Sequence, residues 1–373
     1  MKAISNVDVR LKNYHNVYHT IYNAPDGITL KEIGAALHLS LPTVNTCIAH
    51  LLGENLIEYG SLEDSTGGRK PRTITIHKNA KYAIGIATSK HHVRLMLSNL
   101  RGETIAFEKH NISFVYHKKY FTMLNDMVME LLRVHSINHA QVLGIGVSIA
   151  GLVTDDGELI TAPTLQIKNK NLKSMLSCFH FPVRFINDAS AAGIAEWWHS
   201  DKAKHFCCLY IESGIGGAII INGSPYNGNR GRSGEFGHMC IAEHSPVCSC
   251  GKEGCFEALC SADRLSQDFG IDLDAFFTAC PDNAEYTAVL NRYLCNLAKG
   301  IANIHTLFDT DLCVSGFIVP YLIPYEEKLK QYIQKQMLVS ETPSFLRFSK
   351  IPNRSAALGA ALQWMNEFLK NIN

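Results

Sequence analysis

Four residues in the middle of the chain have the types and the spacing of a metal site. A histidine is followed ten residues later by a group of three cysteines, the set being His238, Cys248, Cys250 and Cys255. One imidazole and three thiolates fill a tetrahedral zinc shell, so the predicted site is structural, because a catalytic zinc keeps one position open for water. The glycines between the last two cysteines allow the backbone to curl and the sulfurs to converge. A chance group of free thiols is the alternative.

The composition is that of an ordinary globular protein. The chain has 373 residues, of which 46% are hydrophobic and 18% charged, with 35 Lys and Arg against 34 Asp and Glu. This length favours two or three domains. Its apolar runs are far shorter than the roughly 20 residues of a membrane helix, and the N-terminus lacks the apolar stretch of a secretory signal. We therefore expect no membrane contact and a cytoplasmic location, where the twelve cysteines do not form disulfides.

The first eighty residues predict a small helical domain that ends in a hairpin. Apolar residues recur at helical spacing over 13–22, and Thr29 with Glu32 has the pattern of a capping box at the start of a second helix. A third helix begins at Ser40 or Leu41, with a proline in its first turn. Strands at 56–59 and 72–76 then flank a glycine-rich loop. This order predicts a winged helix-turn-helix, a DNA-binding domain, over residues 1–80.

Two parts of this domain have residues suited to DNA. The third helix is the expected recognition helix, and its polar residues are Ser40, Thr43, Asn45 and Thr46, with His50 as a further candidate. The domain has eight Lys or Arg and seven Asp or Glu, so its positive charge is local. That charge gathers in the wing, whose cations are Arg69, Lys70 and Arg72. Beside two glycines they have a shape suited to a narrow minor groove, although a solvated hairpin tip is the alternative.

After residue 80 the chain alternates predicted strands and helices, which indicates an α/β body. Strands at 82–87 and 93–98 surround a loop, and strands at 205–212 and 217–222 repeat this layout around a glycine-rich loop. We interpret the repetition as a weak internal duplication that gives two lobes. Further strands are expected at 142–148 and 183–187, and helices at 120–134, 189–198, 286–308 and 356–369.

The sequence GEFGHM at 234–239, followed by CSCGKEGCFEA at 248–258, resembles the signature of the ROK family of sugar-responsive repressors, open reading frames and sugar kinases. The resemblance extends from about residue 80 to the end and includes INDAS at 186–190, SGIGG at 213–217 and AALGAA at 356–361. It implies an actin-like ATPase fold with two lobes, 81–190 plus 355–373 and 191–354, in which zinc braces a substrate loop. The N-terminal winged helix matches the repressor branch.

The same resemblance implies a monosaccharide site between the lobes. Asn187 and Asp188 would hold ring hydroxyls from one lobe, and Glu235, His238 and Glu257 would approach from the other. His238 would bind zinc through one nitrogen and sugar through the other, so that metal loss loosens the pocket. Asp188 has a second interpretation as the N-cap of the helix that follows it, and both roles can coexist. Glu257 taken alone is more typical of a solvated helix face.

The phosphate-binding end of the family's kinases is altered in this sequence. The kinases have an Asp followed by two glycines, a Thr and a Lys, whereas here Ala87 takes the carboxylate position and Ser89 and Lys90 carry side chains where the backbone must approach phosphate. Glu212 also appears where a Gly is usual and would repel phosphate. We therefore expect no ATP binding and no enzyme activity, with Asp188 as a vestigial general base.

These observations together predict a sugar-responsive transcriptional regulator, a repressor, of carbohydrate metabolism genes. Its expected partners are operator DNA, a monosaccharide effector and a second copy of the chain, as a homodimer or a dimer of dimers, because two-fold operators need paired DNA-binding domains. A ROK sugar kinase that kept a regulatory N-terminus is one alternative. A repressor controlled by a protein partner instead of a sugar is another. The sequence does not identify the sugar, the operator or the interface.

Overall fold

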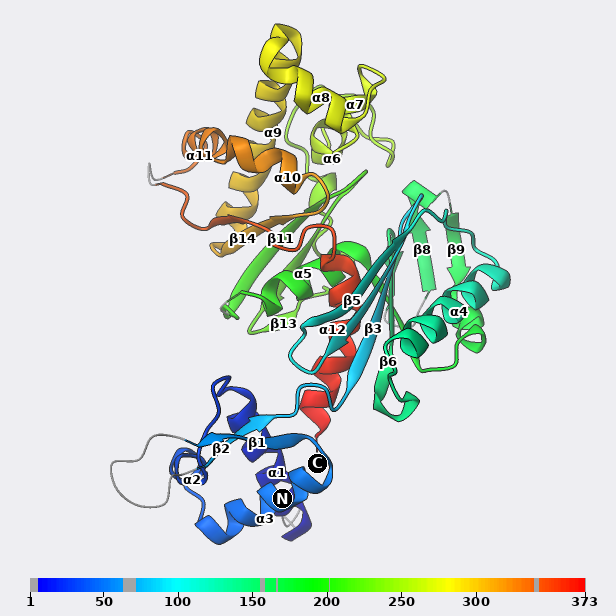
Figure 1. The fold of residues 1–373 in the computed structure, drawn as a ribbon. Helices are drawn as coiled ribbons and strands as arrows, with labels where there is room; N and C mark the ends of the chain where they lie inside the picture. The colour runs from blue at the N-terminus through cyan, green and yellow to red at the C-terminus, as the bar shows by residue number, and fades with distance from the viewer. Residues whose placement is uncertain are drawn as a thin grey trace.

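The computed structural model describes residues 6–62, 72–154, 158–165, 167–200, 202–338 and 342–372. A small N-terminal domain lies at one end of a larger α/β body, and the chain's C-terminal helix reaches back to it (Figure 1). The predicted wing residues Arg69 and Lys70 lie outside the described residues.

The N-terminal domain consists of three helices and a hairpin, as the sequence predicts. Its elements are α1 (Asn6–Tyr22), α2 (Leu30–Leu37), α3 (Leu41–Gly53), β1 (Ile57–Leu62) and β2 (Arg72–Ile76), the two strands being antiparallel. The predicted capping box is present, because the Thr29 hydroxyl accepts the Glu32 N–H and the Glu32 carboxylate accepts the Thr29 N–H. α1 includes residues from Asn6 on, more than expected, because its first stretch NVDVRLK alternates apolar and polar residues and so lacks helical spacing.

The body contains two five-stranded mixed sheets with matching topology. The first has the order β10-β6-β3-β4-β5 and the second has the order β13-β12-β11-β14-β15. In each, an antiparallel pair (β3 with β4, β11 with β12) is extended on one side by an antiparallel strand and on the other by two parallel strands. The internal duplication expected from the sequence is thus visible as a repeated strand order. The strands of the first sheet are β3 (Tyr82–Thr88), β4 (Val93–Asn99), β5 (Thr104–His110), β6 (Val142–Ile149) and β10 (Val183–Asn187).

The second sheet comprises β11 (His205–Ile211), β12 (Ile215–Ile221), β13 (Ser224–Pro225), β14 (Asp311–Ser315) and β15 (Leu346–Phe348). β12 begins before the expected position at the glycine-rich loop, because Ile211 and Ile215 already pair across the hairpin. A third sheet of three antiparallel strands, which the sequence analysis did not predict, is formed by β7 (Leu152–Val153), β8 (Glu158–Ala162) and β9 (Ile167–Asn171).

Two helices pack between the main sheets, namely α5 (Asp188–Trp198) and α12 (Ser355–Asn371). They approach so closely that a Cβ added to Gly359 would lie 1.6 Å from the Ala191 carbonyl oxygen. α12 also packs on β3 and β6, while α5 packs on β11 and β12. The two helices therefore connect the sheets through their backbones.

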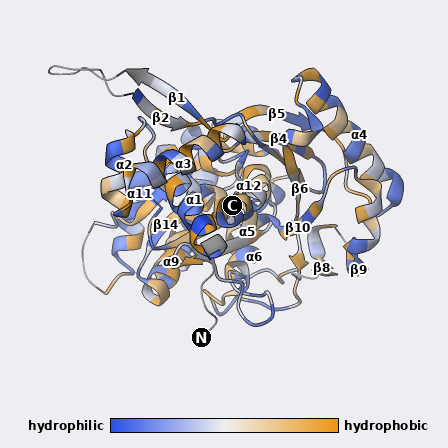
Figure 2. Cartoon of the chain, turned by 90° about the horizontal axis from the view of Figure 1, so that it is seen from below, coloured by the Kyte–Doolittle hydropathy of each residue, from blue (hydrophilic) through white to orange (hydrophobic). Residues whose placement is uncertain are grey.

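The remaining helices cover the outer faces of the body. α4 (Lys118–Val134) covers the first sheet with one apolar face, and in Figure 2 it shows both hydrophilic and hydrophobic residues. The apolar core of the second sheet is shared by α6 (Phe256–Cys260), α7 (Arg264–Gln267), α8 (Leu273–Ala279), α9 (Ala284–Phe308), α10 (Val319–Leu322) and α11 (Glu326–Gln334). Short 3₁₀ helices occur at η1 (His139–Gln141), η2 (Pro163–Leu165), η3 (Leu172–Cys178), η4 (Phe236–His238), η5 (Cys280–Asp282) and η6 (Ile323–Tyr325).

Across the ranges that the structure describes, no single helix is long and apolar enough to cross a membrane. α2 and α3 meet the length and composition requirements only as a pair, and that pair is bent by 115°. All twelve cysteines belong to the described part of the chain, and none of them forms a disulfide.

Candidate functional site

The predicted metal ligands converge. The ligand atoms of His238, Cys248, Cys250 and Cys255 all lie within 4.8 Å of one another. Cys248 Sγ is 3.7 Å from His238 Nδ1, and the Sγ atoms of Cys250 and Cys255 are 3.6 Å apart. A tetrahedral zinc with Zn–S bonds of about 2.3 Å separates its sulfur ligands by about 3.8 Å. The four side chains thus fit a tetrahedral ion with no ligand position left for water.

Two glycines shape the loop that presents the thiols. Gly251 and Gly254 have φ angles of +85° and +82°, a region that residues with a side chain rarely adopt. A Cβ on Gly254 would also lie 2.3 Å from the Ala242 carbonyl oxygen. The Gly251 N–H donates to the Cys248 carbonyl, so the turn is closed before the last cysteine. These contacts agree with the role that the sequence suggested for the glycines.

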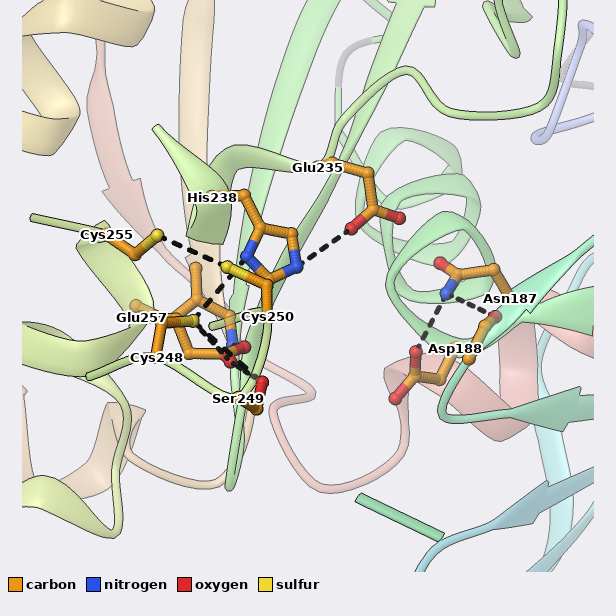
Figure 3. A network of polar contacts seen from close by, with 11 residues as sticks. Asn187, Asp188, Glu235, His238, Cys248, Ser249, Cys250, Cys255 and Glu257 are labelled. Atoms are coloured by element: carbon orange, nitrogen blue, oxygen red, sulfur yellow. Dashed lines mark hydrogen bonds and ion pairs between the residues drawn. The ribbon is translucent and has the colours of Figure 1, made fainter. Parts of the chain in front are cut away.

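The second imidazole nitrogen of His238 faces Glu235. Nε2 lies 3.8 Å from Glu235 Oε2, on the opposite side of the ring from the thiols (Figure 3). Burial raises the pKa of Glu235 and neighbouring Glu257 adds to the rise, while His238 opposes it. Both Glu235 and His238 line the cleft between the lobes. The arrangement links the metal cluster to the cleft through one side chain.

Glu257 lies in the first turn of α6 and is engaged by protein donors. Its Oε2 accepts the Ile215 N–H at 2.9 Å, and its Oε1 accepts the Ser249 hydroxyl at 3.1 Å. It therefore ties the cysteine loop to the start of β12, instead of occupying the solvated helix face that was its alternative interpretation. Glu257 also lines the cleft, and a carboxylate has lone pairs left for a further donor.

Asn187 and Asp188 lie at the start of α5, across the cleft from Glu235 (Figure 3). The expected helix cap is present, but the prediction that Asp188 forms it was wrong. The cap is Asn187, whose Oδ1 accepts the Ser190 N–H at 2.9 Å, and Asp188 is the first helical residue. Asn187 Nδ2 also donates to the Gly151 carbonyl. Because Asn187 takes the capping role, the Asp188 carboxylate is left with the Ala189 N–H and the Asn187 amide.

Asp188 has a carboxyl group whose pKa is strongly raised. Burial raises its pKa to about 7, with a further rise from the negative charge of Glu212 and a smaller one from Glu235. Hydrogen bonds from backbone N–H groups partly oppose this rise. Near neutral pH the carboxyl group is therefore close to its midpoint and can either donate or accept a hydrogen bond.

The cleft has a volume of about 670 Å³, within the usual range for small-molecule sites. It is lined by the β3–β4 hairpin and residues 150–152 and 161–164 on one side, and by the β11–β12 hairpin and the 231–238 loop on the other. Its walls combine small apolar residues, hydroxyls and an amide with carboxylates and with the cations Lys90, Arg94 and Arg232. The hydroxyls, the amide and the carboxylates can bind a ligand rich in hydroxyl groups.

One end of the cleft contains an ion pair that the sequence analysis missed. Arg94 on β4 and Glu212 after β11 face each other, with Arg94 Nη1 3.8 Å from Glu212 Oε1. The Tyr210 hydroxyl donates to the same carboxylate at 2.9 Å. Ala87, Ser89 and Lys90, the residues at the expected phosphate end, line the same cleft, and Ala87 pairs with Arg94 across the β3–β4 hairpin. Glu212, which was expected to repel phosphate, therefore has a cationic partner and a hydroxyl donor within the protein.

The expected DNA-contacting residues occupy two elements of the N-terminal domain. Ser40 caps α3, and its hydroxyl lies 2.9 Å from that of Thr43. Asn45 and Thr46 are exposed on α3, whereas the partly buried His50 stacks on Tyr14 with ring centroids 4.2 Å apart. Arg72 is exposed at the start of β2, with its guanidinium 4.7 Å from the centre of the Tyr59 ring.

The fold and the paired lobes define this chain as a member of the ROK family, whose family model matches residues 83–367. A xylose repressor of Caldicellulosiruptor bescii is 26% identical over an alignment of 369 positions that covers 92% of each chain. Among solved structures, a ROK family transcriptional regulator described as a homologue of E. coli MLC protein covers 98% of this chain and 99% of its own, with a TM-score of 0.76 and 20% identity. A ROK glucokinase of Streptomyces griseus, solved with glucose and AMPPNP, covers 76% of this chain and 98% of its own, with a TM-score of 0.65 and 19% identity.

Proposed function

We propose that this chain is a DNA-binding transcriptional repressor whose two lobes, 81–190 plus 355–373 and 191–354, close on a monosaccharide. The observation that carries the proposal is the alignment with the C. bescii xylose repressor over 92% of both chains, because the uncovered 8% is shorter than the N-terminal domain, so that the alignment extends into this domain as well as the cleft. A cytoplasmic location follows from this role, since the regulator must share a compartment with its operator.

The sugar is proposed to lie between Asn187 and Asp188 on one side and Glu235, His238 and Glu257 on the other. These five residues line one cleft, and they combine donors and acceptors as ring hydroxyls require. D-xylose is the first candidate, because the aligned relative is a xylose repressor. Glucose and N-acetylglucosamine belong in the same test, since the lining alone does not select among monosaccharides.

Zinc is proposed to occupy the cluster of His238, Cys248, Cys250 and Cys255. The separations of 3.6 and 3.7 Å between the ligand atoms match a tetrahedral ion, and the donor set suits zinc. When bound, the ion supplies structural bracing and fixes the His238 ring, so that Nε2 stays directed toward Glu235 and the cleft.

The N-terminal domain is proposed to bind DNA as a winged helix-turn-helix. The bend of 115° between α2 and α3 falls within the range of helix-turn-helix modules. Ser40, Thr43, Asn45 and Thr46 would face the major groove, while Arg69, Lys70 and Arg72 would lie along the minor groove or the backbone. A homodimer, or a dimer of dimers, would place two such domains on a two-fold operator.

We further propose that the chain is not a kinase and binds no ATP. Ala87 offers no carboxylate for magnesium, and its cross-strand partner Arg94 faces Glu212, so an ion pair lies next to the position where the kinases have the carboxylate. A sugar kinase is the second candidate, favoured by one observation: the raised pKa of Asp188, about 7, suits a general base. Sugar-dependent release of ADP from magnesium-ATP would favour the kinase.

The test of the proposed function has two measurements on the full-length chain. D-xylose, glucose and N-acetylglucosamine are screened by thermal shift, because a ligand that binds only the native state raises the melting temperature. Fluorescence anisotropy then measures the affinity for a duplex selected by the chain from a random-sequence library, with and without the stabilising sugar. We expect one sugar to stabilise the chain and to weaken DNA binding. DNA affinity that no sugar changes would contradict the proposal.

A further inference from the structure

Helix α5 connects the cleft with the N-terminal domain. Its cap Asn187 and first residue Asp188 line the cleft, and Trp198 is its last residue. The helix has 11 residues, which span about 16 Å at a rise of 1.5 Å per residue. Because helical hydrogen bonds resist a change in length, a shift of the first turn along the helix axis is carried to Trp198.

The packing around α5 leaves little room for the helix to bend. Gly359 of α12 contacts the Ala191 backbone, where a Cβ would lie 1.6 Å from the carbonyl oxygen. On the opposite side, a Cβ on Gly193 would lie 2.2 Å from Ala218 Cβ of β12. Densely packed interiors respond to strain by moving elements as units. We therefore expect α5 to move as one body between α12 and the second sheet.

The C-terminal end of α5 contacts the turn between β4 and β5, residues 99–103. The Trp198 indole N–H donates to the Arg101 carbonyl at 3.1 Å. Gly102 lies against the same ring and has a φ of +75°. A Cβ added at this position would lie only 2.6 Å from Trp198 Nε1, so the turn and the ring are in close contact. The Lys202 ammonium lies 4.6 Å from the Trp198 ring centre. The turn is thus bound to the end of α5.

The same turn holds the end of α1. The Tyr22 hydroxyl donates to the Leu100 carbonyl at 3.1 Å, and the Arg101 guanidinium donates to the Tyr22 carbonyl. That guanidinium also lies 4.7 Å from the Tyr22 ring centre. Tyr22 is therefore held at its side chain and at its backbone. A second contact joins α1 to the end of α12, where His19 Nε2 lies 2.8 Å from the Leu369 carbonyl oxygen; Figure 2 shows α1 beside the C-terminus.

We propose that Trp198, Arg101 and Tyr22 form a relay by which a ligand at the first turn of α5 repositions the N-terminal domain. The inference rests on the proposed function and names the path of regulation from its site. A ligand held by Asp188 favours one position of α5, Trp198 and the bonded turn follow, and Tyr22 carries the end of α1 with them. The three are positioning residues, because none of them lines the cleft or belongs to the residues proposed to contact DNA. For such coupling, affinity changes of about 5- to 150-fold are typical.

The test compares matched variants of the full-length chain. Trp198→Phe keeps an aromatic ring but removes the N–H that reaches Arg101, and Tyr22→Phe removes the hydroxyl that reaches Leu100. The controls are Trp197→Phe, which loses only its N–H bond to the Ala203 carbonyl, and Tyr18→Phe, whose hydroxyl has no partner among the described residues. For each protein, affinity for the selected duplex is measured with and without saturating D-xylose, and xylose affinity is measured by calorimetry.

We expect both relay variants to bind xylose and DNA separately within about twofold of the wild-type affinities. The factor by which xylose weakens DNA binding should be at least about fivefold smaller in them than in the wild type. The two controls are expected to keep that weakening. A merely structural role would lower both separate affinities or the melting temperature instead. Coupling that survives in both Trp198→Phe and Tyr22→Phe overturns the relay. Wild-type protein that binds xylose and DNA with no coupling overturns the proposed function, a result distinguishable from failure of the relay.

Discussion

His238 Nε2 lies 3.8 Å from Glu235 Oε2, while Nδ1 of the same ring lies 3.7 Å from Cys248 Sγ. One imidazole therefore faces the metal cluster and the cleft at the same time. Neither the cleft nor the cluster can change the orientation of this ring without affecting the other. The geometry makes the two sites interdependent, because both use residues of the segment 235–257 and share His238.

Loss of the metal is therefore expected to weaken sugar binding. Cys250→Ser removes one thiolate, and the metal content should fall from one zinc per chain, as measured by mass spectrometry. Sugar affinity should fall about tenfold or more, because losing one hydrogen bond to a charged group costs roughly 1.5–3 kcal/mol. Cys240→Ser is the matched control, since Cys240 is exposed and near the loop but outside the cluster. If the zinc-free protein bound sugar with unchanged affinity, the metal cluster and the sugar site would be independent, which would contradict the prediction.

The sequence predicted the parts of this arrangement that depend on local pattern. The spacing from His238 to Cys255, the capping box at Thr29 and the paired hairpins all lie within short stretches whose chemistry is readable by itself. The Arg94–Glu212 pair was not predicted, because Arg94 belongs to an ordinary-looking strand and meets Glu212 only when the two lobes face each other.

Two further differences between the sequence prediction and the structure also arise from contacts between separate parts of the chain. Asn187 and Asp188 are both good capping residues, and the choice between them depends on where β10 ends, which is set by its parallel pairing with β6. The strands β7, β8 and β9 are short, with polar residues along β9, so they carry no clear alternation. These three strands form because they pair with one another, more than because of the β propensity of their residues.

The Arg94–Glu212 pair is expected to stabilise the fold through charge balance. Arg94→Met leaves the Glu212 carboxylate unpaired beside Tyr210, and we expect a loss of about 3 kcal/mol in the free energy of unfolding. The double variant Arg94→Met with Glu212→Gln should recover most of that loss. Urea unfolding of the wild type, both single variants and the double variant gives the coupling energy. Strictly additive losses would mean that the pair contributes no coupling.

Asp188 is expected to make stability depend on pH. Its folded pKa of about 7 lies above the ordinary value of 3.8, so the native state keeps a proton that the unfolded state releases near pH 4. The free energy of unfolding should therefore fall as pH rises through the window from about 4 to 7, and level off above it. Asp188→Asn should remove this fall and raise stability by up to a few kcal/mol at about pH 8. Urea unfolding across that window tests this, and parallel curves for the two proteins would contradict it.

The crossing of α5 and α12 is expected to tolerate no added methyl group. Gly359→Ala places a Cβ 1.6 Å from the Ala191 carbonyl oxygen, and overpacking of this kind costs typically about 1–3 kcal/mol or more. Gly53→Ala is the control, because a Cβ there meets no heavy atom within 4 Å, and the change should be neutral or stabilising by roughly 0.5–1 kcal/mol. Thermal unfolding of both variants is the measurement, and equal melting temperatures would argue against backbone contact at the crossing.

Arg72 is expected to contribute to DNA binding through charge alone. It is exposed at the start of β2, where its guanidinium lies over Tyr59. Arg72→Ala should weaken binding similarly for all duplex sequences and should reduce the slope of log affinity against log salt by about 1, because one phosphate contact is lost. Asn45→Ala should instead reduce discrimination between sequences, by roughly 1–3 kcal/mol for a lost base contact. Arg133→Ala serves as the control, since Arg133 is an exposed cation on α4 of the α/β body. A salt slope that Arg72→Ala leaves at the wild-type value would place this arginine away from the DNA backbone.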